Sequence, residues 1–219
     1  MTQDNLATVG RRERRKQQTR RALLDAAMEL FAERGVYATR LEDITERADL
    51  GKGAFYNYFE SKDALIAELI SEGVQRLSVN LQGLDPEKPF NDRVGFVITA
   101  HERFFDEHPE QIVLFHQARG LLKLKTQGTS RLRQAFANYL VVIAGALWGD
   151  EGVTAESHPR RLDIVTALVG AITGYRSFRI AVGAPVNPDT IVGVLTAGLP
   201  DDETVRSRGA TRPSVKAQG

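Results

Sequence analysis

The sequence predicts an all-α fold of about nine helices, and three observations support this prediction. Apolar residues recur every three or four positions along almost the whole chain, as they do on one face of an α-helix. No segment shows the sustained alternation of apolar and polar residues that is typical of a strand. Segments rich in turn-forming residues, at 84–89, 127–129 and 149–158, separate the periodic stretches from one another.

Four helices are predicted before residue 84. The first covers about residues 14–34 and ends at Gly35, a common helix stop, and its apolar face carries Leu23, Ala27, Leu30 and Phe31. Two short helices follow, at about residues 41–48 and 52–59. Ser61 is the expected N-cap of a long fourth helix, whose apolar face carries Ile66, Ile70, Val74, Leu77 and Leu81.

Five more helices are predicted after the proline-containing loop at 84–89. Asn91 or Asp92 is expected to cap the first, whose inward residues are Val94, Val97, Ile98, His101, Phe104 and Phe105. Pro109 suits the first turn of the next, which reaches about Lys123. The others cover about 130–147, 159–182, which is apolar on almost every side, and a last helix that Asn187 and Pro188 begin.

The charge distribution is uneven along the chain. The formal net charge is +1, yet residues 1–21 contain seven basic and two acidic residues, so the rest of the chain is acidic. A short basic segment on an acidic body suggests contact with a polyanion, although a merely solvated tail has the same composition. There are no cysteines, which excludes disulfides and thiolate zinc sites, and no apolar run of the roughly 20 residues that span a bilayer. The polar N-terminus lacks the apolar region of a secretory signal, so a cytoplasmic location is expected.

The most informative stretch covers residues 41–62, LEDITERADLGKGAFYNYFESK. It reads as a short helix, a turn at residues 49–51 and a second short helix, which is a helix-turn-helix. The first helix would brace against the core through Leu41, Ile44 and Ala48. The second would then enter a major groove of DNA, which is wide enough to admit a helix, and present side chains to base edges.

Residues 19–69 resemble the N-terminal domain of the TetR family of transcriptional regulators. The resemblance is carried by Ala26-Ala27, Leu30-Phe31, Gly35, Thr39, Ile44, Ala48, Leu50, Gly53, Phe55-Tyr56, Tyr58-Phe59, Ser61-Lys62 and Leu65. Four residues depart from the family pattern: Thr45 replaces Ala, Asp49 replaces Gly, Gly51 replaces Ser and Ala54 replaces Thr. Asp tolerates the left-handed backbone of a turn better than most residues, so these changes affect the choice of operator rather than DNA binding itself.

The resemblance implies roles for individual residues. Thr39, Tyr56, Tyr58 and Lys62 would contact phosphate, with Lys52 and Asn57 as candidates for base or phosphate contacts. Gly53 would let the backbone come close to DNA, and Ala54 would lie beside it on the recognition helix. The basic segment that includes Arg20 would lie along the backbone or in the adjacent minor groove. We expect Phe55 and Phe59 to be core aromatics.

The resemblance also implies four regions: a basic flexible arm (1–18), a helix-turn-helix DNA-binding domain (19–62), a ligand-binding and dimerisation domain (63–199) and a disordered tail (200–219). A small, mainly apolar effector would bind in the larger domain, and Arg119 or Arg179 would suit an anionic group on it. A solid aromatic core is the alternative for each of the expected ligand-contacting residues. These are Phe104, Phe115, His116, Arg119, Phe136, Tyr139, Ile143, Tyr175 and Phe178.

The protein is expected to act as a homodimer. The residues predicted to form the dimer interface are Leu168, Ala171, Ile172, Ile191 and Leu195. The expected function is that of a repressor, released from a palindromic operator when an effector tilts the helix at 61–81. An activator or corepressor-dependent regulator, and a helical interaction adaptor that no longer uses its DNA-binding domain, are the alternatives. No glycine-rich phosphate loop or nucleophile motif is present, so no enzymatic activity, cofactor or membrane partner is expected. His101 and His108 lie two helical turns apart with Glu102 and Glu107 nearby, but a metal site would need a convergence that the sequence does not show, so surface or pocket histidines are expected instead of a metal site.

Overall fold

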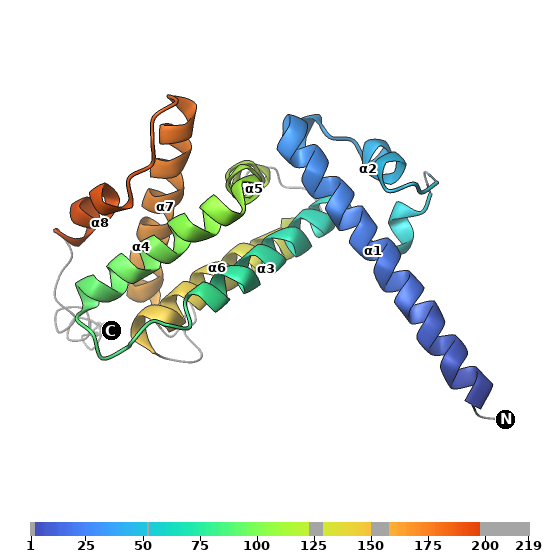
Figure 1. Ribbon diagram of the computed structural model, residues 1–219, viewed down its shortest axis with the longest axis horizontal. Helices are drawn as coiled ribbons and strands as arrows, with labels where there is room; N and C mark the ends of the chain where they lie inside the picture. Colours follow the sequence, from blue (N-terminus) through green and yellow to red (C-terminus); the bar gives the residue numbers. More distant parts are fainter. Residues whose placement is uncertain (1–2, 52, 123–128, 150–157, 198–219) are drawn as a thin grey trace, which may run out of the picture. The chain divides into compact units, whose positions relative to one another are not determined.

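The computed structural model describes residues 3–51, 53–122, 129–149 and 158–197, and within them the chain is helical, with no strand (Figure 1). This confirms the all-α prediction. The elements are α1 (Gln3–Ala38), α2 (Leu41–Arg47), a 3-10 turn η1 (Phe55–Asn57), α3 (Lys62–Asn80), α4 (Phe90–Glu107), α5 (Pro109–Leu121), α6 (Thr129–Trp148), α7 (Pro159–Ala181) and α8 (Pro188–Thr196). The predicted tail at 200–219 lies outside the described residues.

Local signals in the sequence place several helix starts correctly. Ser61 accepts a hydrogen bond from the amide of Ala64 at 3.1 Å, which confirms it as the N-cap of α3. Asn187 likewise caps α8 through its side chain, and prolines occupy the first turns of α5 and α7. Helix α4 begins at Phe90, before the predicted caps Asn91 and Asp92, because the carbonyl of Pro89 accepts from the amides of Asp92 and Arg93.

Helix α1 differs from its prediction at the N-terminal end. It begins at Gln3 rather than near Arg14, so the basic segment is helical and not the flexible arm that its charge suggests. The physical reason is that arginine, lysine, glutamine and glutamate are good helix formers, and that no proline interrupts residues 3–38. The basic side chains therefore lie on a continuous helix that also carries core residues.

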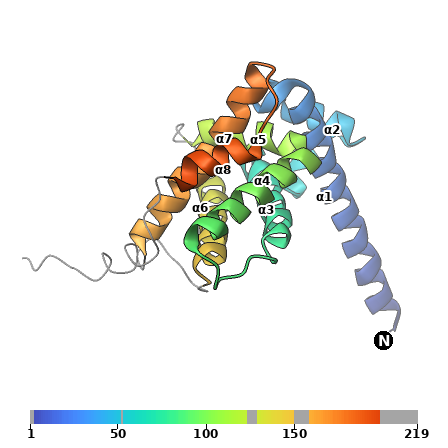
Figure 2. The same cartoon turned by 60° about the vertical axis from the view of Figure 1, so that its left-hand side comes forward.

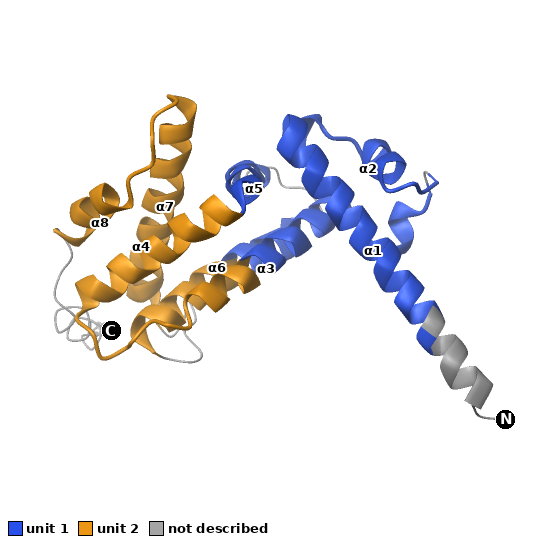
Figure 3. Cartoon of the chain, viewed as in Figure 1, with its two compact units in different colours: residues 1–73, 108–136 blue, residues 74–107, 137–219 orange. Residues whose placement is uncertain are grey.

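The chain divides into two compact units (Figure 3). Unit 1 consists of residues 1–73 and 108–136, and unit 2 of residues 74–107 and 137–219. This division differs from the predicted domains at 19–62 and 63–199, because α5 packs against α1 and joins the N-terminal helices. In unit 2, α8 and α7 pack against α4 (Figure 2).

The core of unit 1 brings the first helices of the chain together. Helix α1 contributes Leu23, Ala27, Leu30 and Phe31, as its periodicity predicts, and each of these is at most 3% exposed. Phe55 is fully buried and Phe59 is 4% exposed, with their ring centroids 5.6 Å apart. Both are core aromatics, as expected, and they fix the segment that follows the turn of the helix-turn-helix.

The core of unit 2 is built around α4. Its predicted inward residues are all buried, including Val94, Val97 and Phe105. Arg176 on α7 forms two ion pairs there: it donates to the buried Glu102 at 2.6 Å and to Asp106, whose side chain is 70% exposed, at 2.6 Å. In the part of the chain that the structure describes, no helix is long and apolar enough to cross a membrane.

A fully buried histidine makes the stability of unit 2 depend on pH. Nδ1 of His101 lies 2.7 Å from the carbonyl oxygen of Val97, and Nε2 lies 2.7 Å from the hydroxyl of Tyr139. A carbonyl can only accept, so Nδ1 donates to Val97, and Nε2 of the neutral ring accepts from Tyr139. Burial lowers the pKa of His101 to about 4, although the bond to Val97 opposes this shift.

We expect the protein to lose stability as the pH falls from about 6.5, the unperturbed histidine value, toward 4. In this window the unfolded chain takes up a proton that the folded chain excludes, so the stabilisation is complete above about pH 6.5 and falls below it. The full loss from this group is on the order of 3 kcal/mol. Urea unfolding between pH 7.5 and 4.5 measures it, and His101→Gln should flatten the pH dependence.

The comparison with His101→Gln isolates the histidine from a neighbouring carboxyl. Burial raises the pKa of Glu102, although Arg176 opposes the shift, so this group changes stability in the opposite direction as the pH falls. Glu102 is present in both proteins and its effect cancels in the difference. Equal pH dependence in the two proteins would contradict the assignment.

Candidate nucleic-acid interface

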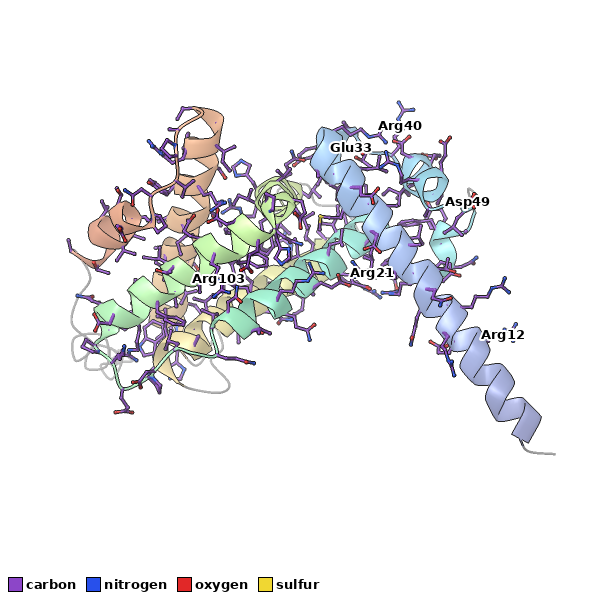
Figure 4. The ribbon with its side chains drawn as sticks, viewed as in Figure 1. Arg12, Arg21, Glu33, Arg40, Asp49 and Arg103 are labelled. Atoms are coloured by element: carbon purple, nitrogen blue, oxygen red, sulfur yellow. The ribbon has the colours of Figure 1, made fainter. Side chains whose placement is uncertain are left out.

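The turn after α2 has the geometry of a helix-turn-helix. The amide of Leu50 donates to the carbonyl of Thr45 at 2.8 Å, and the amide of Asp49 donates to Glu46 at 3.0 Å. These two bonds form a Schellman motif, which ends a helix on a residue in the left-handed region. Asp49 occupies that position with a φ of 54°, where the family pattern has glycine, and Figure 4 shows it beside α2. The turn therefore forms despite the departure at this position.

The chain after this turn presents an exposed polar surface. Gly53, Tyr56 and Asn57 are exposed, with Tyr56 at 65%, and Ala54 and Tyr58 are partly exposed. The ring of Tyr56 packs edge-on against buried Phe55, with centroids 5.6 Å apart, so the core positions an otherwise exposed phenol. A 3-10 turn of residues 55–57 stands where a helix at 52–59 is predicted, and Lys52 lies outside the described residues. These exposed groups are the ones available to a nucleic acid.

Three residues with predicted phosphate contacts have partners inside the protein instead. Lys62 donates through Nζ to the carbonyls of Val36 and Thr39, and it lies 5.7 Å from the centre of the Phe31 ring. Burial lowers the pKa of Lys62, and nearby carboxylates oppose this shift. The ammonium thus satisfies carbonyls at and just after the end of α1, and its predicted phosphate contact stays a prediction.

The other two are Thr39 and Arg20. Thr39 is 2% exposed, and its hydroxyl donates to the carbonyl of Gly35 at 2.8 Å. Arg20 donates to Glu68 and to the carbonyl of Tyr58, and its guanidinium lies 4.4 Å from the centre of the Phe59 ring. Both side chains hold the helix-turn-helix against α1 and α3, and the DNA contacts predicted for them stay predictions.

Three glycines allow α5 to approach the other helices of unit 1. A Cβ atom at Gly35 would stand 2.9 Å from Nε2 of Gln117, and one at Gly120 would stand 2.3 Å from the hydroxyl of Tyr37. Gln117 accepts from the amide of Val36 at 2.6 Å through Oε1, and its carbonyl accepts from Tyr37 at 3.1 Å.

The third glycine lies on α3. A Cβ atom at Gly73 would stand 2.6 Å from Oε1 of Gln111, which is itself a residue of α5. Contacts on α1 and α3 therefore fix α5 within unit 1. The sequence does not predict this arrangement, because which side chains face these glycines is visible only in the folded chain.

The predicted ligand-contacting residues divide between the two units. Phe104, Tyr139 and Ile143 are buried in unit 2, and Phe115 is buried in unit 1 with its ring centroid 6.0 Å from that of Phe136. Among the other predicted ligand-contacting residues, His116 and Phe178 are exposed, and Arg119 and Tyr175 are partly exposed. Tyr139 directs its hydroxyl to His101, and Tyr175 donates to the carbonyl of Asn187 at 3.2 Å.

The predicted dimer residues are mostly covered by their own unit. Leu168, Ile172 and Ile191 are at most 6% exposed, and Ala171 and Leu195 are partly exposed. A side chain that its own unit covers offers little area to a partner, and the predicted interface stays a prediction. The exposed face of α7 carries Ala167, Gly170 and Phe178, and the partly exposed Gly174 lies in the same stripe.

Comparisons with known proteins agree with this geometry. Residues 23–69 match the family described as "Bacterial regulatory proteins, tetR family". The HTH-type transcriptional regulator RutR of Escherichia coli is 38% identical over 72 residues, which are 33% of this chain and 34% of RutR. The chain thus aligns with about a third of the length of this curated relative.

Solved structures extend the likeness to most of the chain. The transcriptional regulator FadR of Bacillus subtilis, in complex with stearoyl-CoA, superposes with a TM-score of 0.60 at 16% identity, covering 82% of this chain and 98% of FadR. The multidrug binding protein EbrR, complexed with imidazole, gives a TM-score of 0.62 at 19% identity, covering 83% of this chain and 89% of EbrR. At such identities the likeness shows the fold. Residues 23–69, which contain the helix-turn-helix, thus match the tetR family of bacterial regulatory proteins.

Proposed function

We propose that the protein is a ligand-responsive transcriptional repressor that binds a palindromic DNA operator as a homodimer. The observation that carries the proposal is the surface of Gly53, Tyr56 and Asn57, which is exposed and follows a helix-turn-helix turn. The core aromatics Phe55 and Phe59 hold this surface in place. An exposed phenol on a fixed backbone suits contact with a phosphate, and an exposed amide suits a base edge.

Dimerisation is proposed through α7 and α8. Ala167, Gly170, Gly174 and Phe178 recur at intervals of three or four residues and form one stripe of α7. The stripe is apolar, Phe178 is 75% exposed, and Val194 on α8 is 70% exposed. Exposed apolar side chains next to small residues suit close helix packing across a two-fold axis. Such a dimer would hold two recognition surfaces about one DNA turn apart.

The effector is proposed to be a small, mainly apolar molecule. FadR is described with stearoyl-CoA and EbrR with imidazole, so proteins of this fold bind such molecules. Helix α5 supports the proposal from within unit 1, because it carries Phe115, His116 and Arg119 as well as Gln117, which bonds to the end of α1. A ligand that displaces α5 would therefore move the helices that position the recognition surface. The ligand must bind the released state better than the operator-bound state, and a roughly 100-fold preference supplies about 2.7 kcal/mol.

Operator binding by variants of the recognition surface tests the proposal. The operator is first selected from genomic fragments with the purified protein, and affinity is then measured by fluorescence anisotropy. Tyr56→Phe should weaken binding about 5- to 10-fold, because each subunit then makes one hydrogen bond fewer to phosphate. Asn57→Ala should weaken binding and reduce discrimination between operator and mutated sites.

Thr99→Val is the control, since it removes an exposed hydroxyl from unit 2, which holds no part of the helix-turn-helix. It should leave operator affinity unchanged. Failure of the wild-type protein to select any fragment would overturn the proposed function and favour an interaction adaptor.

A further inference from the structure

The N-terminal end of α1 forms one wall of a basic groove. Arg12, Arg15, Lys16 and Thr19 line it at helical positions i, i+3, i+4 and i+7, together with Glu13. Tyr58, which directly follows η1, lines it from the helix-turn-helix. The groove has a volume of about 640 Å³ and is open to solvent on one side. Figure 4 shows Arg12 on the length of α1 that runs beyond the helix-turn-helix.

The direction of this basic face is fixed by the core of unit 1. Residues four apart on a helix lie on one face, so the stripe that includes Lys16 and Thr19 continues into Leu23, Ala27 and Leu30. The side chains of Leu23, Ala27 and Leu30 are at most 3% exposed and pack in the core. The groove side chains therefore project from the same side of α1 that faces the helix-turn-helix.

The cations of the groove differ from those nearer the core in their partners. Arg20 pairs with Glu68, and Arg21 pairs with Asp25 and Glu72, so these two serve the fold. Among the described residues, Arg12, Arg15 and Lys16 form no ion pair. Three cations and one carboxylate, Glu13, thus face an open groove that also holds a tyrosine and a threonine. Arginine, lysine and hydroxyl side chains are the groups that contact the sugar–phosphate backbone of DNA.

We propose that this groove binds the sugar–phosphate backbone of the DNA that flanks the base pairs read by the helix-turn-helix. The inference rests on the proposed function and adds a second contact to it. An α-helix with its side chains is about 10–12 Å across, and the minor groove of B-DNA is about 6 Å wide. A helical extension therefore lies against the backbone, and it does not enter the minor groove as a flexible arm does. The contact is independent of sequence and adds to affinity and salt dependence.

Variants of two adjacent arginines distinguish the proposed groove contact from the general effect of removing a positive charge. Arg14 and Arg15 are both exposed on α1, but Arg15 lines the groove and Arg14 does not. Each is changed to alanine, and binding is measured to the selected operator with roughly ten flanking base pairs at each end and to the same operator without them. Arg15→Ala should weaken binding to the long DNA several-fold and leave the short DNA unaffected. The slope of log K against log salt should fall by about 0.9 for each phosphate that the variant no longer neutralises, counted over both subunits.

The helical character of the extension needs a variant that keeps every charge. Gln17 is exposed, lies between Lys16 and Thr19, and does not line the groove. Gln17→Pro breaks the helix there, since proline cannot donate its backbone hydrogen bond. It should weaken binding to the long DNA as much as Arg15→Ala does, with an unchanged urea midpoint to show that the rest of unit 1 is folded.

The possible results have distinct meanings. Wild-type affinity of Gln17→Pro for the long DNA would overturn the helical extension in favour of a flexible arm. Equal losses in Arg14→Ala and Arg15→Ala, or equal losses on both DNAs, would overturn the groove. If the wild-type protein binds neither DNA, the proposed function fails. This result differs from a failure of the groove alone, in which the wild-type protein binds both DNAs but Arg15→Ala does not weaken binding to the long DNA selectively.

Discussion

Replacing Gly170 with arginine is expected to make the protein monomeric and to weaken operator binding about 100-fold or more. Gly170 is exposed on α7, and a Cβ atom placed on it would meet nothing within 4 Å. The side chain therefore fits the isolated protomer, where removing a glycine from a helix favours folding by up to about 1 kcal/mol. In the proposed dimer the same side chain would place an unpaired charge between two α7 helices, which is strongly unfavourable.

The operator effect follows from the loss of bivalency. A dimer that occupies one half-site binds the second intramolecularly, and this gain is typically about 10²- to 10⁴-fold. Sedimentation velocity at micromolar concentration measures the dimer, and anisotropy measures the operator affinity. Thr99→Arg is the control, because it adds the same charge to the exposed side of α4 in the same unit. A Gly170→Arg protein that remains dimeric would show that α7 is not the interface.

The features that sequence predicts well are those that local chemistry determines. The caps Ser61 and Asn187 and the first-turn prolines Pro109 and Pro159 act within one helical turn, and the structure has helices at each of them. The prediction for the basic segment is wrong because charge alone suggests a solvated arm. Its residues also favour helix, and α1 supplies a nucleus that extends through them.

The features that sequence predicts poorly depend on neighbours that are distant in the chain. Lys62 and Thr39 match a family motif, but only the folded chain shows that their polar atoms bond to the carbonyls of Val36 and Gly35. The apolar pattern of α7 indicates that two faces of the helix are covered. It does not indicate which face packs within the protomer and which is left for a partner. In the structure, Ile172 and Ile191 are buried in unit 2, and the stripe through Gly170 is left exposed.

Replacing Gly35 with alanine is expected to lower the free energy of unfolding by about 2–6 kcal/mol, the sum of two separable costs. The first is conformational: Gly35 has a φ of 83° and a ψ of 164°, a region that glycine alone adopts readily, and strain there costs about 1–3 kcal/mol. The second is steric, because the new methyl group would stand 2.9 Å from the amide of Gln117. If that amide moves away, the amide of Val36, a residue only 1% exposed, loses its hydrogen bond, which costs about 1–3 kcal/mol.

A double-mutant cycle with Gln117→Ala separates these costs. In the Gln117→Ala protein the side chain that meets the new methyl group is already absent, so Gly35→Ala should cost only the conformational part. The coupling between the two positions should therefore be about 1–3 kcal/mol, well above the error of urea unfolding. Operator affinity should fall in Gln117→Ala as well, because the amide of Val36 then loses its side-chain partner on α5 near the end of α1, which directly precedes the helix-turn-helix. Strict additivity in the cycle, with unchanged operator affinity, would show that α5 does not hold the DNA-binding helices through Gln117.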